Sequence, residues 1–324
     1  MGVAIIDPIT HGLIGAALSR LSGNPLELTD PILIGCTLGA MLPDLDIVTH
    51  VKGRLNYLLQ HRGASHSLLA LGSMALILGT AVYYVFPSSP WHTVVFWTLI
   101  GTLSHGLADL LNSYGTQLLW PFNKKKFTIN MAMLTEPVIF LLFLASLLVS
   151  IWQPDLAFWS TKLTLFLSAL YLLLREYHRE RTKKKLVAYF NLTEKEKIKV
   201  LPAMYRPFSW AFIIYYSDRV KVGVMSREGA KILQVLPQWD KNDPVISKAM
   251  AGEIAEIFNK LTPHLHIIRK DSDSEVKVEF VDLRYWNKES FIYTGEVYFQ
   301  SDGNIAREKF YPLGRENSQG VLIE

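Results

Sequence analysis

The sequence predicts a mainly α-helical membrane protein, in which a bundle of about six transmembrane helices is followed by a small cytoplasmic α+β domain. Two observations support this fold class. Residues 1–175 carry nearly all of the long apolar runs, whereas residues 176–324 are polar and mixed. Basic residues gather in every second connection between the apolar runs. We therefore predict a helical membrane domain over 1–175 and a separate domain over 176–324.

The membrane domain contains four apolar runs that approach or exceed the roughly 20 residues a bilayer requires. These runs are 67–86, 92–112, 134–152 and 157–175. Two earlier segments, 9–22 and 31–48, are shorter or interrupted, and they can form a helical hairpin that enters the membrane without spanning it. The alternative for all six is a buried bundle in a soluble protein, which four separate long apolar runs disfavour.

The basic residues predict the topology of these helices. Lys and Arg occur in the connections after 31–48 and after 92–112, and in the stretch REYHRERTKKK at 175–185. The turns at 87–91 and 153–157 contain neither residue. The positive-inside rule therefore places the basic connections and the C-terminal domain in the cytoplasm, in a multi-pass protein of the bacterial inner (plasma) membrane. Because the net charge of +4 sits largely in such clusters, we predict no nucleic-acid partner. The sequence leaves the oligomeric state open.

The C-terminal domain shows strand and helix patterns. RPFSWAFIIYYSDRVKVGVM predicts paired strands with a turn near Ser217 and Asp218, and SEVKVEFVDLRYW and SFIYTGEVYFQSDGNIAREKFY predict further strands. DPVISKAMAGEIAEIFNKLTP has a helical pattern that ends at Pro263. His264 and His266 have no carboxylate partner at metal-binding spacing, so we expect any catalysis to reside in the membrane domain. The role of the C-terminal domain stays open.

Acidic residues and histidines cluster at three short sites in or beside the apolar runs. These are Asp44 and Asp46 in MLPDLD, His61 and His66 in QHRGASHS, and His105 and Asp109 in LSHGLAD. Ionisable groups at membrane depth are costly and usually mark function. Carboxylates and imidazoles are ligands for zinc, manganese or iron. The single cysteine, Cys36, excludes a thiolate metal site and a disulfide framework.

The spacing within these sites suits metal ligands. His105 and Asp109 are four residues apart, so on a helix they project from one face about 6 Å apart. Asp7 and His11 repeat that separation, and Pro8 can open a helix just after Asp7. One carboxylate of the Asp44–Asp46 pair could bind a metal while the other bridges a second metal or orients a histidine.

The predicted topology brings the candidate ligands to one layer at the cytoplasmic side. The three sites border basic connections there, and Glu136 opens the following helix on the same side. If the first segment begins in the cytoplasm, Asp7 and His11 join them. An HxxxD pair or a PDLD turn is ordinarily structural when it occurs alone. The convergence of the sites is what favours a multi-metal centre.

The residues between His61 and His66 have two possible roles each. Arg62 can clamp a phosphate oxygen, or it can serve as a positive-inside anchor. Gly63 allows a tight turn, and Ser65 is well placed to cap the next helix. Asp46 or Glu136 can act as a general base or orient a ligand. The candidate catalytic residues are therefore Asp46, Arg62 and Glu136.

Four sequence elements together resemble a known family. DPITHGLIGAALS, LPDLD, HRGASHS and SHGLADLLNSYGTQLLWP, in this order, resemble the inner-membrane metal-dependent hydrolases, some of which are under SOS-repressor control. The resemblance covers roughly residues 5–175. It extends more distantly to the superfamily of zinc-dependent phospholipase C and single-strand nuclease, whose members bind a cluster of zinc ions. Where many relatives have Asp before Pro ahead of the fourth long helix, this chain has Glu136-Pro137. The ligands that the resemblance implies are His11, Asp44, His61, His66, His105 and Asp109.

These observations lead us to expect an integral membrane hydrolase that holds two or three divalent transition-metal ions. We expect zinc, with manganese as the alternative. Water activated by the metals would attack a phosphoester of a lipid or another small molecule at the cytoplasmic membrane face. A different class is a membrane-bound regulatory or metal-sensing protein whose site is not catalytic. A metal-ion transporter is a third possibility, but its polar groups should extend through the full bilayer depth.

Overall fold

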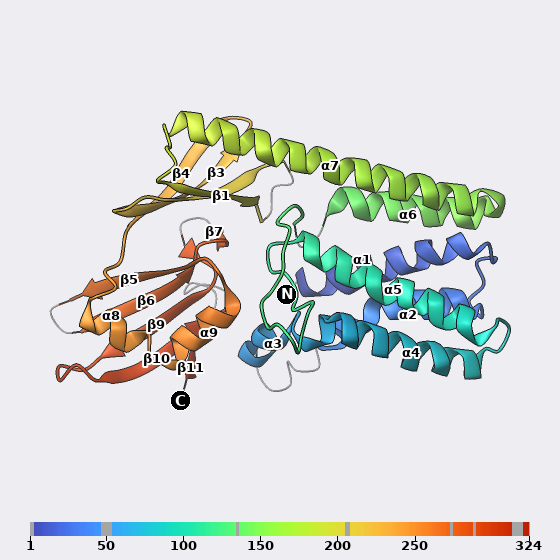
Figure 1. Cartoon of the computed structure of the whole chain (residues 1–324), viewed down its shortest axis with the longest axis horizontal. Coiled ribbons are helices and arrows are strands. Elements are labelled where there is room, and N and C mark those ends of the chain that lie inside the picture. The colour runs from blue at the N-terminus through green and yellow to red at the C-terminus, as the bar shows by residue number, and fades with distance from the viewer. Residues whose placement is uncertain are drawn as a thin grey trace. The chain divides into compact units, whose positions relative to one another are not determined.

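The computed structural model describes residues 3–46, 54–133, 136–204, 208–272, 275–287, 290–312 and 320–323 (Figure 1). The chain forms two compact units, Met1–His178 and Arg179–Glu324. Lys52, which belongs to the first predicted basic connection, lies outside the described residues, as does the side chain of Asp7.

The first unit is built from helices. Its short helices are α3 (Arg54–Gln60) and the 3₁₀ turns η1 (Arg20–Ser22), η3 (Ala64–His66) and η4 (Pro154–Leu156). Its longer helices are α1 (Val3–Ser19), α2 (Pro31–Met41), α4 (Leu68–Val85), α5 (Trp91–Leu111), α6 (Pro137–Trp152) and α7 (Ala157–Tyr189), the last of which continues into the second unit. A helix therefore lies in each of the six predicted apolar segments.

Two of these helices have boundaries that differ from the sequence prediction. α1 begins at Val3 and includes Pro8, so the expectation that a helix opens just after Asp7 is wrong. α2 ends at Met41, and residues 42–46 continue as a 3₁₀ turn that carries Asp44 and Asp46. At its N-terminus, α2 has Pro31 as the first helical residue and Asp30 as the cap. The Asp30 carboxylate accepts hydrogen bonds from Ile32 N and Leu33 N.

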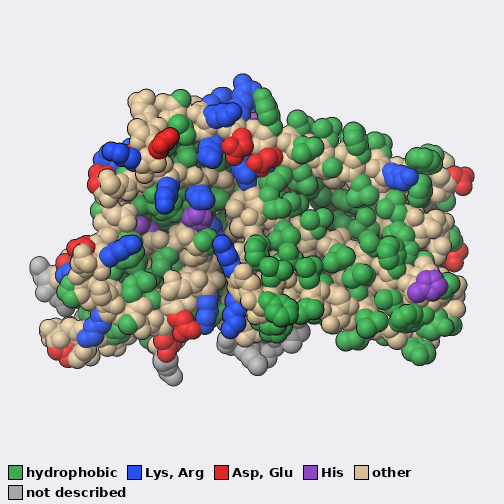
Figure 2. Space-filling view, in the orientation of Figure 1, with side chains coloured by type: hydrophobic (Ala, Val, Ile, Leu, Met, Phe, Trp, Pro, Cys, Tyr) green, Lys and Arg blue, Asp and Glu red, His purple; other side chains and the backbone are tan. Residues whose placement is uncertain are grey.

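Three helices are long and apolar enough to cross a membrane: Leu68–Val85, Trp91–Leu111 and the stretch Pro154–Tyr189. α6 is also apolar, but it has only 16 residues. A count of six spans is therefore not confirmed. On the face shown in Figure 2, the helical unit presents mainly hydrophobic side chains. Large apolar residues of its helices such as Ile77, Leu141 and Phe166 are exposed, and a soluble unit would rarely leave so many uncovered.

Helices α1, α2 and α5 approach one another closely around Cys36. A Cβ atom on Gly15 of α1 would lie 2.6 Å from the Cys36 carbonyl oxygen, and one on Gly101 of α5 would lie 2.9 Å from its carbonyl carbon. Both positions therefore need glycine. Because α-helical positions repeat every 3.6 residues, this close packing continues one turn away, at His11 on α1 and at His105 on α5.

The second unit contains two antiparallel sheets and two helices. One sheet has the order β1 (Lys197–Pro202), β2 (Trp210–Tyr215), β3 (Arg219–Ser226) and β4 (Gly229–Pro237). The other has the order β11 (Val321–Ile323), β10 (Ile305–Tyr311), β9 (Thr294–Phe299), β6 (Val276–Asp282) and β5 (Leu265–Asp271). The helices are α8 (Pro244–Ala249) and α9 (Glu253–Leu261), and β7 (Trp286–Asn287) pairs with β8 (Ser290–Phe291).

The side chains of strand β2 are buried on both faces of the first of these sheets. All of its residues except Tyr215 are buried. Phe212 and its alternate neighbours pack with Leu186 near the end of α7. Ile213, on the opposite face, packs with Val281 and Leu283 beside the other sheet. Alternating side chains of one strand thus contribute to two cores.

The predicted pairing of β2 with β3 is confirmed, since Tyr215 pairs with Val220 across the turn that contains Ser217 and Asp218. The single helix predicted before Pro263 is wrong in one respect. It is divided into α8 and α9, and Gly252 lies at the N-terminus of α9 with β-region backbone angles. The second unit is thus α+β, as expected.

Candidate metal centre

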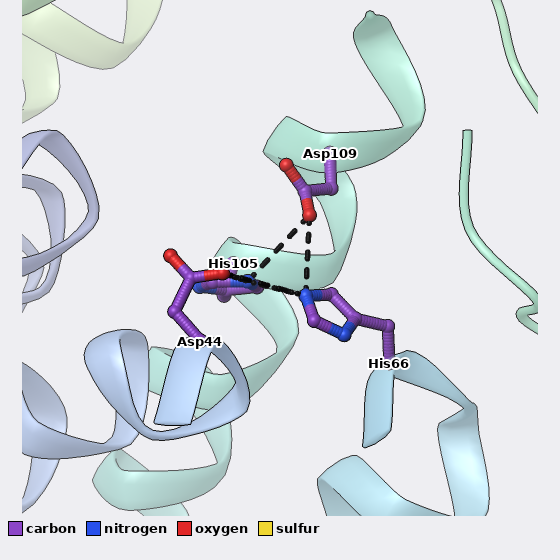
Figure 3. A group of neighbouring side chains, drawn as sticks. All are labelled: Asp44, His66, His105 and Asp109. Carbon is purple, nitrogen blue, oxygen red and sulfur yellow. Dashed lines mark hydrogen bonds and ion pairs between the residues drawn. The ribbon is translucent and has the colours of Figure 1, made fainter. Parts of the chain in front are cut away.

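Four side chains from three separate segments converge in the first unit. Asp44 lies on the 3₁₀ turn after α2, His66 ends η3 just before α4, and His105 and Asp109 lie on the last two turns of α5. One ligand atom of each lies within 4.8 Å of those of the other three. Figure 3 shows the four side chains pointing toward one another. The α4–α5 hairpin and the end of α2 place them at the same end of the bundle.

The separations between these donor atoms match a small tetrahedral metal site. His66 Nε2 lies 3.3 Å from Asp109 Oδ2 and 3.7 Å from Asp44 Oδ1, and His105 Nε2 lies 3.6 Å and 3.5 Å from the same two oxygens. The two Nε2 atoms are 3.0 Å apart. Tetrahedral zinc with bonds of about 2.0–2.1 Å separates its ligand atoms by about 3.3–3.4 Å. The four side chains therefore fit one zinc-sized ion.

The hydrogen bonds of the two imidazoles direct their lone pairs into this cluster. His105 Nδ1 lies 2.7 Å from the Ala40 carbonyl oxygen, which can only accept, so Nδ1 carries the proton. His66 Nδ1 lies 2.9 Å from Ser65 Oγ. Because Ser65 donates its own hydrogen to Asp46 Oδ2 at 3.1 Å, it accepts from His66. Because Nδ1 of each ring carries a proton, Nε2 is the nitrogen through which each ring, in its neutral form, could bind a metal ion in the cluster.

The cluster is closed to solvent and favours a positive charge. His66 and His105 are 0% exposed, Asp109 2% and Asp44 6%. Both carboxylate oxygens of Asp44 and Oδ2 of Asp109 are buried and accept no hydrogen bond from the described residues. Burial alone would lower the pKa of His66, but the nearby carboxylates of Asp109, Asp44 and Asp46 raise it to about 9. A proton on His66 Nε2 would supply the positive charge that a bound metal would otherwise provide.

Asp109 divides its two oxygens between the cluster and Arg62. Oδ2 faces the two imidazoles, whereas Oδ1 accepts a 2.8 Å ion pair from Arg62 Nη2 and a weaker 3.4 Å hydrogen bond from Asn112 Nδ2. Arg62 is itself buried, and its guanidinium lies over the Tyr114 ring. Arg62 therefore contacts a candidate ligand and helps to position it.

A second group of candidate ligands shares Asp44 and adds Asp46 and His61. His61 Nδ1 lies 2.8 Å from Asp46 Oδ1. The other oxygen of Asp46 accepts from Arg62 N at 3.3 Å and from the Ser65 hydroxyl. Asp46 thus fixes the 61–65 loop through three hydrogen bonds. The His61 side chain is 21% exposed, more than any member of the first group.

The loop itself has a left-handed residue that the sequence did not indicate, and its helix cap is not the one expected. The left-handed residue is Arg62, with φ of 61°, whereas Gly63 has φ of −89°. Gly63 is still required, because a Cβ atom would lie 2.7 Å from the Gln60 carbonyl oxygen. The cap of α4 is Ser67, whose Oγ accepts from Ala70 N, so the assignment of that role to Ser65 is wrong.

Among the described residues, two further predicted site residues, His11 and Glu136, belong to neither group of candidate ligands. The His11 ring stacks on His105 with centroids 3.9 Å apart, and its Nε2 is 3.8 Å from Asp109 Oδ1. Glu136 accepts hydrogen bonds from Met133 N and from the Tyr171 hydroxyl, and it lies 3.4 Å from Arg175 Nη2. Glu136 thus ties the start of α6 to α7.

Some contributing groups were missed by the sequence interpretation. The Ala40 carbonyl has no sequence signature, although it lies one helical turn after Cys36, where α2 is pressed against α5. Ser65 carries a signal in hindsight, because it immediately precedes a candidate ligand and follows the other histidine by four residues. Tyr171 and Arg175 lie on one face of α7, four residues apart, opposite the carboxylate that they contact.

Comparisons with known proteins agree with the division of the chain into a helical unit and an α+β unit. Residues 6–182 match the family described as YdjM inner membrane protein. Residues 244–313 match the domain described as YfhP C-terminal alpha/beta plait domain. The chain is also 27% identical over 315 residues, covering 93% of each protein, to the uncharacterized protein YfhP of Bacillus subtilis (strain 168). No solved structure matches the chain.

Proposed function

Since this chain belongs to the YdjM inner membrane protein family, we propose that it is a membrane-embedded, metal-dependent hydrolase that acts on a phosphoester at the cytoplasmic face. The observation that carries this proposal is the set of four buried donors. The Nε2 atoms of two imidazoles lie 3.0 Å apart, and two carboxylate oxygens complete the set. Without a cation, these four groups would repel one another in a site of low dielectric.

The proposal assigns roles to the chain's own residues. Asp44, His66, His105 and Asp109 would hold a zinc ion, with manganese as the alternative. A bound zinc ion supplies a Lewis acid that lowers the pKa of water and polarises a phosphoryl oxygen. Arg62 and the Ala40 carbonyl hold two of the ligands in place, whereas the PDLD carboxylate Asp46 holds the neighbouring loop.

His61 would take the role nearest to the substrate. Asp46 accepts the Nδ1 proton of His61, which leaves Nε2 able to accept a proton or to bind a further ion. His61 is also the most exposed member of the two groups. A second ion held by Asp44, Asp46 and His61 would give a site with three protein ligands and an open position, the arrangement typical of catalytic zinc.

The membrane location supports the substrate class that we propose. The four-ligand cluster lies at one end of a helical bundle that exposes many large apolar side chains and contains three helices long and apolar enough to cross a membrane. The alternation of basic connections supports a multi-pass topology in which this end and the second unit are cytoplasmic. A phosphorylated lipid or isoprenoid phosphate could present its head group there without leaving the bilayer.

A second candidate function is a regulatory or metal-sensing protein. The closed burial of the four-ligand cluster favours it, because four protein ligands without an open position are typical of structural zinc. The more exposed His61–Asp46 group beside the cluster is the feature that favours the hydrolase.

A hydrolysis assay on the purified full-length chain distinguishes the two functions. We expect zinc-stimulated hydrolysis of a phospholipid or phosphodiester substrate, abolished in His66→Ala and in His61→Ala. His264→Ala, in the other unit, is the matched control. A protein that binds zinc with the four ligands but hydrolyses none of these substrates would support the regulatory function.

A further inference from the structure

Ser65 occupies a position in the centre that neither the metal ligands nor the helix cap explains. It is part of η3, between the loop that Asp46 holds and the candidate ligand His66. Its hydroxyl oxygen lies 3.1 Å from Asp46 Oδ2 and 2.9 Å from His66 Nδ1. The neighbouring Ser67, not Ser65, caps α4.

The direction of both hydrogen bonds follows from the chemistry of the partners. An ionised carboxylate can only accept, so the single hydroxyl hydrogen of Ser65 must point to Asp46. The hydroxyl oxygen then has only lone pairs to offer to His66. The Nδ1 of His66 must therefore carry a proton, so Nε2, which faces Asp44 and Asp109, is the nitrogen that is left to bind a metal ion when the ring is neutral.

We propose that Ser65 is a positioning residue that relays the charge of Asp46 to His66 and thereby fixes the tautomer and orientation of this ligand. The proposal rests on the proposed metal function. Asp46 needs the relay because its Oδ2 is 3.7 Å from His66 Nδ1, too far for a direct hydrogen bond. His105 needs no such residue, because the Ala40 carbonyl contacts its Nδ1 directly.

Loss of the hydroxyl should have a defined consequence. In Ser65→Ala, His66 Nδ1–H would have no acceptor at bonding distance. To reach Asp46 directly, the ring would have to move by about 0.8 Å, which draws Nε2 away from the other three donors. Alternatively, the proton would transfer to Nε2 and block the ligand position. Either change weakens metal binding by about 10- to 100-fold, as is typical when the hydrogen-bond partner of a metal-binding histidine is removed.

The test measures zinc affinity by competition with a chromophoric chelator in the purified full-length protein, together with the visible spectrum of the Co²⁺-substituted protein. We expect Ser65→Ala to bind zinc about 10- to 100-fold more weakly and to change the Co²⁺ spectrum. Ser65→Thr keeps the hydroxyl and should restore both properties. Ser67→Ala is the matched control, since it removes a nearby hydroxyl, that of the α4 cap, which contacts none of the candidate ligands that the structure describes, and it should leave both unchanged.

The outcomes separate the relay from the metal function. Wild-type zinc affinity and an unchanged Co²⁺ spectrum in Ser65→Ala would overturn the relay and leave the metal function intact. A failure of Ser65→Thr to rescue would also overturn it, because the hydroxyl would then not be the active group. If the wild-type protein itself binds no zinc or cobalt, the metal function fails and the relay fails with it. If Ser65→Ala does not fold, Asp46→Asn tests the same relay from its other end, and unchanged affinity there overturns it.

Discussion

The close approach of α5 to α2 should be essential for the metal centre, and Gly101→Ala tests this directly. In the native packing, a Cβ atom at this position would lie 2.9 Å from the Cys36 carbonyl carbon and closer still to its oxygen, whereas ordinary contact begins at 3.4 Å. The two helices must therefore separate by at least 0.5 Å, and by about 1 Å if the oxygen sets the limit.

This separation should be transmitted to the ligand one turn away. His105 Nδ1 is held by the Ala40 carbonyl at 2.7 Å, so a displacement of about 1 Å would break that hydrogen bond. Loss of the hydrogen bond that orients a metal-binding histidine lowers metal affinity about 10- to 100-fold. At a fixed excess of zinc, the stabilisation that zinc provides would fall by about 1.4 to 2.7 kcal/mol.

The assay is thermal unfolding of the full-length protein in detergent, with and without zinc, combined with a zinc titration. Gly72→Ala on α4 is the matched control, because a Cβ atom there meets nothing within 4 Å. It should leave zinc affinity unchanged and unfold no earlier than the parent. Wild-type zinc affinity in Gly101→Ala would refute the claim that the α2–α5 packing positions His105.

Three further predictions concern topology, pH and the division between the units. Reporter fusions after Lys185 should report the cytoplasm and fusions after Ser89 the opposite side; a cytoplasmic report at Ser89 would contradict the multi-pass arrangement. Burial lowers the pKa of His266 to about 4. Below pH 6.5 this residue therefore binds fewer protons in the folded second unit than in the unfolded chain. The free energy of unfolding of that unit should consequently fall by on the order of 3 kcal/mol between pH 6.5 and pH 4. Amide hydrogen exchange in β5 and β6 should show this loss. Burial also lowers the pKa of His264 to about 4, so His266→Gln, which can still donate to the Pro237 carbonyl, should remove only the part that His266 contributes; an equal acid sensitivity in the variant would exclude His266 as a cause. Finally, His264→Ala should keep hydrolysis within a few-fold of the parent, whereas His66→Ala should abolish it, and loss of activity without loss of metal in His264→Ala would place catalytic groups in the second unit.

The helical part of the fold could be predicted from the sequence because its signals are local. Apolar runs identified a helix in each of the six segments, and alternation with a turn identified the β2–β3 pair. The boundaries depended on interactions that a run of residues does not reveal. Pro8 is the sixth residue of α1, so the helix continues through it although it cannot donate the usual intrahelical hydrogen bond. α2 ends before Asp44, where the chain tightens into a 3₁₀ turn.

In the candidate site, too, local features could be predicted from the sequence, whereas contacts between distant segments could not. Spacing on one helix could predict that His105 and Asp109 share a face, and their 3.6 Å separation between Nε2 and Oδ2 agrees with it. The partners of Arg62 and Glu136 could not be predicted, because both depend on tertiary packing. Arg62 reaches Asp109 from a left-handed backbone position, and Glu136 is held by two residues of α7.

The central claim is that Asp44, His66, His105 and Asp109 together hold a metal ion. Elemental analysis of the full-length protein, purified without chelator and dialysed against trace zinc, tests it most directly. We predict at least one tightly held equivalent that is lost in both Asp44→Ala and His105→Ala, and a second equivalent that is lost selectively in His61→Ala. Full metal occupancy in Asp44→Ala and His105→Ala, or no bound metal in the wild-type protein, would contradict the account.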